Sequence, residues 1–152
     1  MFRGDFQVSL DLKGRMAIPS RYRERILDEC GGSLMVTVSV THRCLSVYPS
    51  TEWQRIEDEI QSLPTFDQQA QALRHLLIGH AHESDMDGHG RILLSSPLRE
   101  WAGLDRKVRV VGQVRKFELW DEAAWAARIA ELHGPSGALL SEPSEALRSI
   151  VL

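Results

Sequence analysis

The sequence predicts a β-rich α+β fold built from two tandem copies of one module. A segment near the N-terminus recurs in the second half of the chain. Short runs of alternating apolar and polar residues lie beside turn residues and indicate strands. Other runs carry apolar residues at helical spacing. The 152 residues are 43% hydrophobic and 26% charged, which is enough apolar material for a buried core.

The repeat is clearest over fourteen residues. Asp11–Glu24 aligns without gaps with Asp87–Glu100, with identical Asp, Gly, Arg, Ser, Arg and Glu positions. A second match places Tyr48 opposite Trp120 and Trp53 opposite Trp125. Fixed-period similarity of this kind indicates repeated structural units. We therefore expect two homologous modules, at residues 1–80 and 81–152.

Each module is expected to begin with a strand, a tight turn and a second strand. In the first copy Phe6, Val8 and Leu10 alternate with polar residues, the turn carries Asp11 and Gly14, and a strand covers residues 16–18. In the second copy the turn covers residues 87–90 and the strand covers residues 92–94. An arginine opens the second strand in both copies.

A short helix and two further strands follow in each copy. The first helix is expected to start near Ser20, and the second to have Ser96 as N-cap and Pro97 as its first residue. The runs rich in β-branched and apolar residues, which predict the strands, are Leu34 to Val40, Leu45 to Tyr48, Val108 to Val114 and Lys116 to Trp120.

Helices are expected to close the modules. One carries Trp53, Ile56, Ile60 and Leu63 before Pro64, and the other carries Trp125, Ile129 and Leu132 before Gly134 and Pro135, so both tryptophans are expected in the core. A bridging helix over residues 67–78 is expected to bury one face, made of Phe66, Ala70, Leu73 and Leu77. A short helix over residues 144–151 is expected to end the chain.

Charge is distributed unevenly along the chain. The net charge is −3, which by itself argues mildly against nucleic-acid binding. However, residues 1–25 hold six basic and three acidic side chains, a net +3, so the remainder carries −6. No apolar run approaches the roughly 18 residues of a membrane span, and no signal segment is evident, so we expect a cytoplasmic protein. Basic charge is concentrated in the first module.

Metal sites and catalysis have weak support. Asp85, Asp87 and Gly90 match the start of a calcium-binding EF-hand loop, but its twelfth position is Ser96 instead of Glu. Four histidines, at positions 75, 80, 82 and 89, lie near one another without the spacing of a known metal motif.

Cysteine chemistry has equally weak support. Cys44 and His42 could suggest a nucleophile and base, yet no third group orients them. The separation of Cys30 from Cys44 matches neither a redox pair nor a zinc knuckle. We expect no enzyme, catalytic residue, metal, cofactor or small-molecule substrate.

Several segments together resemble the MraZ family. They are the two turn motifs Asp11–Arg15 and Asp87–Arg91, the opening Met1–Gly4, the linker Leu77–Ala81 and the run Val111–Asp121. The resemblance covers nearly the whole chain. It implies two AbrB-like modules that form a pseudo-dimeric swapped-hairpin barrel within one chain, with flanking helices. It also implies a nucleoid-associated repressor that binds double-stranded DNA at G-rich direct repeats upstream of its own operon, which is the division and cell-wall gene cluster, and that assembles into homo-oligomeric rings.

The resemblance assigns DNA contacts to Lys13, Arg15 and Arg91. Arginine can make bidentate hydrogen bonds with guanine O6 and N7, and lysine serves phosphate as a point charge. Asp11 and Asp87 are expected to fix the turns, and Gly14 and Gly90 to permit positive φ angles there. His89 replaces Lys13 in the second motif. We therefore expect the first motif to bind DNA more strongly.

One alternative belongs to a different functional class. Modules that resemble AbrB also serve in antitoxins, which bind a toxin protein. Antitoxins usually append a disordered toxin-binding segment, whereas here both modules are complete and the tail is short. The sequence therefore favours a transcriptional regulator and leaves an antitoxin as the second interpretation.

Overall fold

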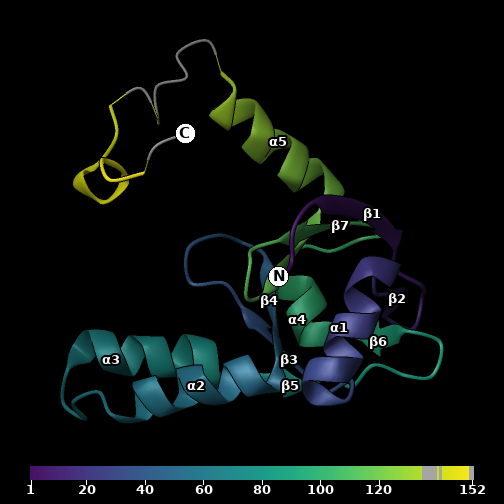
Figure 1. Ribbon diagram of the computed structural model, residues 1–152, viewed down its shortest axis with the longest axis horizontal. Helices are drawn as coiled ribbons and strands as arrows, with labels where there is room; N and C mark the ends of the chain where they lie inside the picture. The colour runs from purple at the N-terminus through teal and green to yellow at the C-terminus, as the bar shows by residue number, and fades with distance from the viewer. Residues whose placement is uncertain (135–139, 141, 151–152) are drawn as a thin grey trace. The chain divides into compact units, whose positions relative to one another are not determined.

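The computed structural model describes residues 1–134, 140 and 142–150. It divides the chain into two compact units, Met1–Glu122 and Ala123–Leu152, which are described separately. The first unit holds all the strands among the described residues, together with most of the helices (Figure 1). No helix of the described residues is both long and apolar enough to cross a membrane.

The first copy of the repeat contains strands β1 to β4 and helices α1 to α3. The strands are Asp5–Ser9 (β1), Arg15–Ala17 (β2), Leu34–Val38 (β3) and Leu45–Pro49 (β4). The helices are Ser20–Cys30 (α1), Ser50–Gln61 (α2) and Gln68–Leu73 (α3), the last continuing as a π-helix, η1, at Arg74–Ile78. Apart from the π-helical turn, these elements are those predicted.

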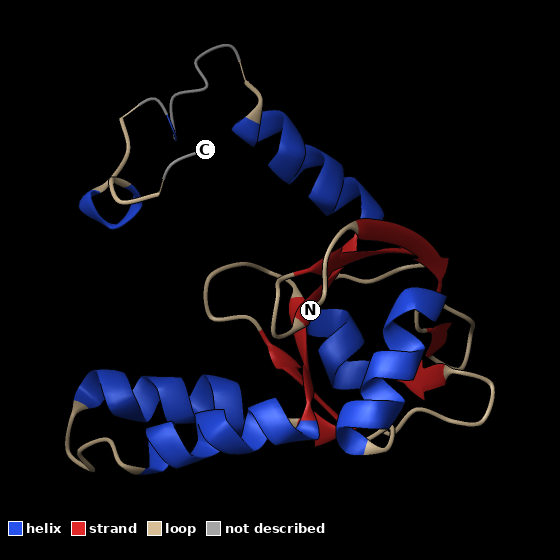
Figure 2. Cartoon of the chain, in the orientation of Figure 1, coloured by secondary structure: helices blue, strands red, loops and turns tan. Residues whose placement is uncertain are grey.

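The second copy has the same order of elements. Its strands are His82–Glu83 (β5), Arg91–Leu93 (β6), Lys107–Gly112 (β7) and Phe117–Asp121 (β8), and its helices are Ser96–Trp101 (α4) and Glu122–Leu132 (α5). A 3₁₀ turn, η2, covers Glu145–Leu147. Figure 2 shows the resulting mixture of strands and helices, which confirms an α+β, strand-rich chain.

The two copies exchange their first strands. The six-stranded sheet has the order β1-β7-β8-β4-β3-β5, and all its neighbours pair antiparallel. β1 belongs to the first copy but pairs with β7 of the second, with Phe6 opposite Val110. β5 belongs to the second copy but pairs with β3 of the first, with His82 opposite Val36. Neither copy therefore completes its own sheet.

Equivalent strands of the two copies also pair with each other. β2 pairs with β6 in a separate two-stranded sheet, in which Met16 lies opposite Ile92. β4 pairs with β8, in which Ser46 lies opposite Glu118. Both pairs join positions that correspond in the repeat. The two copies are therefore related by an approximate two-fold axis that passes through these two pairings.

One hydrophobic core serves both copies. Phe2 and Tyr22 of the first copy pack on Phe117 of the second, with ring centroids 5.3 Å apart in each pair. Met16 and Ile92 each expose only 1% of their surface. The burial of apolar surface between the copies drives their association within the chain.

A second cluster fixes the helical hairpin of α2 and α3, seen side by side in Figure 1. It contains Tyr48, Trp53, Ile60 and Leu77. The buried Thr37 hydroxyl donates a hydrogen bond to the Leu77 carbonyl, near the end of η1, at 2.6 Å. The expected core position of Trp53 is confirmed.

Four local predictions are wrong. Phe66 is 93% exposed, because it lies in the loop before α3 and not on its buried face. Ser95 is the N-cap of α4, so Ser96 and Pro97 are its first two residues. Helix α5 has no buried residue, so Trp125 is not a core residue. The expected helix at 144–151 is reduced to the 3₁₀ turn η2, and residue 151, like residue 135, lies outside the described residues.

Candidate nucleic-acid interface

Each copy of the turn motif is organised by its aspartate. Asp11 Oδ1 accepts hydrogen bonds from the backbone amides of Lys13 at 2.9 Å and Arg15 at 2.8 Å. Asp87 Oδ1 accepts the equivalent bonds from His89 at 2.8 Å and Arg91 at 2.9 Å. Turns held by an aspartate side chain in this way have a fixed backbone path. The start of the following strand is therefore held in place.

The glycines of the turns are required for two reasons. Gly14 and Gly90 have φ angles of +89° and +74°, a region that side chains with a Cβ rarely adopt. In addition, an arginine of the opposite copy packs against each glycine. A Cβ on Gly14 would lie 2.9 Å from Arg99 Nε, and a Cβ on Gly90 would overlap the Arg23 guanidinium. Each turn is thus held by an arginine of the other copy, and we call this pair of interactions the crossed contacts.

Sequence reasoning missed the role of these two arginines. Arg23 Nε donates a hydrogen bond to the Ile18 carbonyl at 2.7 Å, and Arg99 Nε donates to the Leu94 carbonyl at 3.2 Å. Both carbonyls lie just after the ribbon strands. The signal was present in the sequence, because the Arg-Glu pair is identical in the two copies of the repeat. The reason why both copies keep this arginine depends on contacts between the copies.

The ribbon formed by β2 and β6 places Arg15 and Arg91 on one face. Arg15 lies opposite Leu93, and Ala17 lies opposite Arg91. Residues paired across antiparallel strands, and residues two apart along one strand, share a face. These four residues therefore lie on one side, and Met16 and Ile92 lie in the core on the other. The side chains of Arg15 and Arg91 are each 37% exposed.

The two arginines differ in how firmly they are held. Arg15 Nε donates a hydrogen bond to Asp11 Oδ2 at 2.9 Å, whereas Arg91 Nε lies 3.6 Å from Asp87 Oδ2 and has no hydrogen-bond partner in the described structure. The Nη1 and Nη2 groups of Arg15 make no hydrogen bond with any residue that the structure describes. These amino groups can donate parallel hydrogen bonds to two neighbouring acceptor atoms on DNA.

The remaining motif positions are exposed. Lys13 and His89 lie at the tips of their turns, beside the exposed Leu12 and Gly88. Lys13 adds a positive charge next to Arg15, whereas His89 adds one only when protonated. The first turn is therefore the more basic of the two at neutral pH.

Backbone hydrogen bonds lower the pKa of both turn aspartates. The Arg15 amide is the main cause for Asp11, and the Arg91 amide for Asp87, so each pKa lies below the usual 3.8. A lowered folded-state pKa adds stability above pH 3.8, and that stability is lost as the pH falls through the folded-state pKa.

We expect Asp11→Ala to destabilise the protein at pH 7 and to have progressively less effect below pH 3.8. Urea unfolding of wild type and variant across this pH range measures the difference. A gap in unfolding free energy that stays constant down to pH 2 would show that the Asp11 carboxylate does not stabilise the turn.

Gly90→Ala is expected to destabilise the fold by about 1–3 kcal/mol, the usual cost of an unfavourable backbone region, since the added Cβ also displaces Arg23. Gly88→Ala is the matched control, because a Cβ added at Gly88 would have no atom within 4 Å. The melting temperatures of the two variants, measured by thermal unfolding, report the loss of stability in each. Equal melting temperatures for the two variants would contradict the crossed contact.

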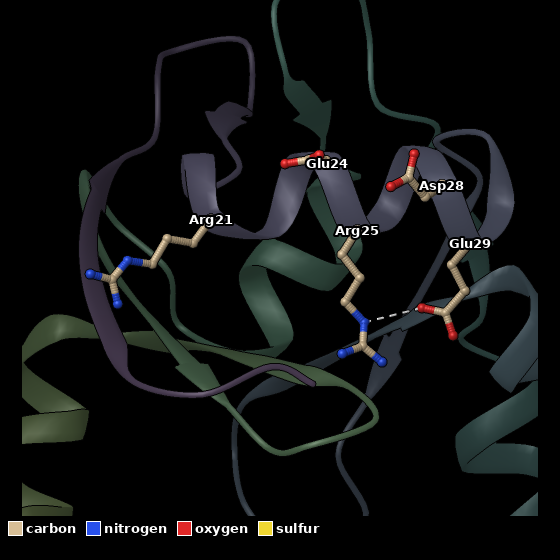
Figure 3. Close-up of a pocket in the computed structure, with 5 residues that line it drawn as sticks. All are labelled: Arg21, Glu24, Arg25, Asp28 and Glu29. Carbon is tan, nitrogen blue, oxygen red and sulfur yellow. Dashed lines mark hydrogen bonds and ion pairs between the residues drawn. The ribbon is translucent and has the colours of Figure 1, made fainter.

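A second charged surface lies on α1 and is unlike a nucleic-acid site. Figure 3 shows the hollow lined by Arg21, Glu24, Arg25, Asp28 and Glu29. Arg25 Nε is paired with Glu29 at 3.2 Å. Three carboxylates outnumber two guanidinium groups, so this surface repels phosphate. It also supplies a control arginine, Arg21, which is exposed and lies off the ribbon.

The catalytic interpretation of Cys44 has no support in the structure. Cys44 is completely buried, and this burial raises the pKa of its thiol to about 12. A protonated thiol is a poor nucleophile at neutral pH. Among the described residues, no three histidine, cysteine or acidic side chains come together as metal ligands.

Comparisons with known proteins agree with the repeat. A family described as MraZ protein, antitoxin-like, matches residues 1–76 and again residues 77–141. The protein called Transcriptional regulator MraZ in Thioalkalivibrio sulfidiphilus is 50% identical over all of both chains. Proteins of the same name in Halorhodospira halophila and Pseudomonas aeruginosa are 46% and 44% identical, again over all of both chains. The chain therefore belongs to the MraZ family, a family of transcriptional regulators.

Proposed function

We propose that this regulator binds double-stranded DNA through the β2–β6 ribbon, with Arg15 and Arg91 contacting bases and Lys13 contacting phosphate. The observation that carries the proposal is the placement of both arginines on the one solvent-facing side of the ribbon. A two-stranded ribbon fits the major groove of B-DNA. Asp11, Gly14, Asp87 and Gly90 support the contact by fixing the turns.

The chemistry of the side chains favours guanine. A guanidinium makes two parallel hydrogen bonds with guanine O6 and N7, and this is the commonest base-specific contact in protein–DNA complexes. The hydrogen bond from Arg15 Nε to Asp11 restricts that side chain before DNA arrives. Less conformational freedom is then lost on binding. Because each chain has two such arginines, we expect it to favour DNA sites that are rich in guanine.

We further propose that the two modules, 1–80 and 81–152, form the swapped-hairpin barrel of AbrB-like proteins as an intramolecular pseudo-dimer. The exchange of β1 and β5 between the copies supports this arrangement. Two contacts join the ribbon to the edge strands of the large sheet. Leu10 pairs with Met16, and the Ser84 hydroxyl donates a hydrogen bond to the Leu93 carbonyl at 2.7 Å.

The proposed assembly is a homo-oligomeric ring that binds several direct repeats at once. One chain offers few base contacts, so its affinity for a single site is modest, and linked subunits gain affinity through effective concentration. The sites are proposed to lie upstream of the protein's own operon, where binding represses transcription. The protein then acts in the cytoplasm, associated with the nucleoid, with no membrane and no small-molecule substrate as partner.

Binding to the DNA upstream of the protein's own gene tests this function. In a gel-shift assay we expect a specific complex with that fragment, weaker binding to a shuffled fragment, and a steep loss of affinity as salt rises. The salt dependence counts the phosphates that the protein neutralises. Equal, weak binding to both fragments would contradict the proposal and leave the antitoxin interpretation.

A further inference from the structure

An exposed leucine lies beside the two arginines of the ribbon. Leu93 is 58% exposed, whereas Ile92 and Leu94 on either side are 1% exposed. Its Cα lies opposite that of Arg15, and Arg91 lies two residues before it on the same face. A solvent-facing strand position usually carries a polar residue. An exposed apolar side chain beside two arginines suits a ligand that presents both anionic and apolar groups.

We propose that Leu93 is a specificity-determining residue that contacts the 5-methyl group of a thymine beside the base read by Arg15. This inference rests on the proposed DNA-binding function. Thymine is the one standard base that presents a methyl group in the major groove, and apolar side chains recognise it by direct contact. Double-stranded DNA thus offers hydrogen-bond acceptors for the arginines and an apolar group for Leu93 on the same surface.

The spacing of the ribbon suits adjacent base pairs. Directly opposed residues of an antiparallel pair have Cα atoms about 4.5–5.5 Å apart. Successive base pairs are separated by about 3.4 Å. Arg15 and Leu93 can therefore reach neighbouring base pairs. The Ser84 hydroxyl, which bonds the Leu93 carbonyl at 2.7 Å, holds the backbone of Leu93 in this position.

Differences between the copies make the face directional. The position equivalent to Leu93 in the first copy is Ala17, which ends at Cβ. Lys13 and His89 differ between the copies in the same way. A two-fold symmetric face would read an inverted sequence, because its two halves would make the same contacts. A face with Leu93 in one copy and Lys13 in the other distinguishes the two directions of a site, as direct repeats require.

A second copy of this chain is the competing occupant of the leucine. Two such faces packed together would bring Arg15 and Arg91 of one copy near the same arginines of the other. Like charges opposed in this way disfavour association. The charge of the face therefore favours DNA.

Replacing thymine by uracil in the DNA removes the proposed contact without changing the hydrogen bonds. The upstream fragment is prepared with dTTP or with dUTP, and its affinity is measured by gel shift for wild type, Leu93→Ala and Phe66→Ala. We expect wild type to bind the uracil fragment about fourfold more weakly for each contacted methyl group. Leu93→Ala is expected to bind both fragments equally, at the affinity of wild type for uracil DNA.

Phe66→Ala is the control, because Phe66 is 93% exposed but lies in the loop before α3, away from the ribbon. It should keep the wild-type preference for thymine. Equal binding of both fragments by wild type overturns the role of Leu93 while leaving the proposed function intact, and no specific binding at all overturns both. A change of oligomeric state in Leu93→Ala, measured by sedimentation, would also overturn the proposal and identify a contact between copies.

Discussion

Arg15→Ala is expected to abolish the specific complex with the upstream DNA. Loss of one bidentate contact with guanine costs about 1–3 kcal/mol, or roughly 5- to 150-fold in affinity. Every subunit of an assembly loses the same contact, so the losses multiply across the repeats that are bound together. The fold should remain intact, since the Arg15 side chain is 37% exposed and its backbone amide still bonds Asp11.

The Arg15→Lys variant distinguishes the contribution of positive charge to DNA binding from that of hydrogen-bond geometry. Lysine keeps the positive charge but lacks the planar pair of donors that matches guanine. We expect this variant to prefer the upstream fragment over the shuffled one much less than wild type does, because phosphate contacts survive while the base contact of Arg15 is lost. Arg91→Ala is expected to reduce specific binding by a comparable or smaller factor, since its turn carries His89 instead of a lysine.

Arg21→Ala is the matched control for these variants. Arg21 is an exposed arginine of the same N-terminal region, on α1 and away from the ribbon. Its loss should leave both the affinity for the upstream fragment and the preference for it close to those of wild type. If Arg15→Ala and Arg91→Ala both shift that fragment as wild type does, the contact residues have been assigned wrongly, although membership of the family would stand.

The local elements could be predicted from the sequence because their signals are local. The apolar alternation before Asp11 and the Asp-x-x-Gly-Arg turn lie within a few residues of one another. Likewise, the helical spacing of Trp53, Ile56 and Ile60 identifies α2 directly. Element boundaries depend on the geometry of single residues, and the N-cap of α4 is Ser95, one residue before the predicted Ser96.

Features that depend on contacts between the copies could not be predicted from local patterns, and only the resemblance to the MraZ family implied a swapped arrangement. Nothing in the sequence around Phe6 indicates that its strand pairs with Val110, more than a hundred residues away. The roles of Arg23 and Arg99 in holding the turns could not be predicted for the same reason, because each packs against a glycine of the other copy. The repeat identified these arginines as equivalent, but only the exchanged arrangement explains why the two positions carry the same residue.

The exchange of strands leads to a strong prediction about the isolated first module. A fragment of residues 1–80 keeps β1 and β2 but loses β7 and β6, which are their partners across the sheets. It also loses Phe117, on which Phe2 and Tyr22 pack. Unpaired strand edges and an open core leave too little buried surface to offset the conformational entropy of folding. We therefore expect no folded monomer.

Two fragments of this kind could still complete each other's strand pairing, because the missing strands of the second copy correspond to strands in the first. β2 of one fragment could pair with β2 of another through Met16, as β2 pairs with β6 through Ile92 in the whole chain. The fragment should therefore be either unfolded or dimeric, with folding that depends on its concentration. Circular dichroism and sedimentation over a range of concentrations measure this. A folded monomer would show that the first module completes its own core, and the exchanged pairing would then not be what holds the two copies together.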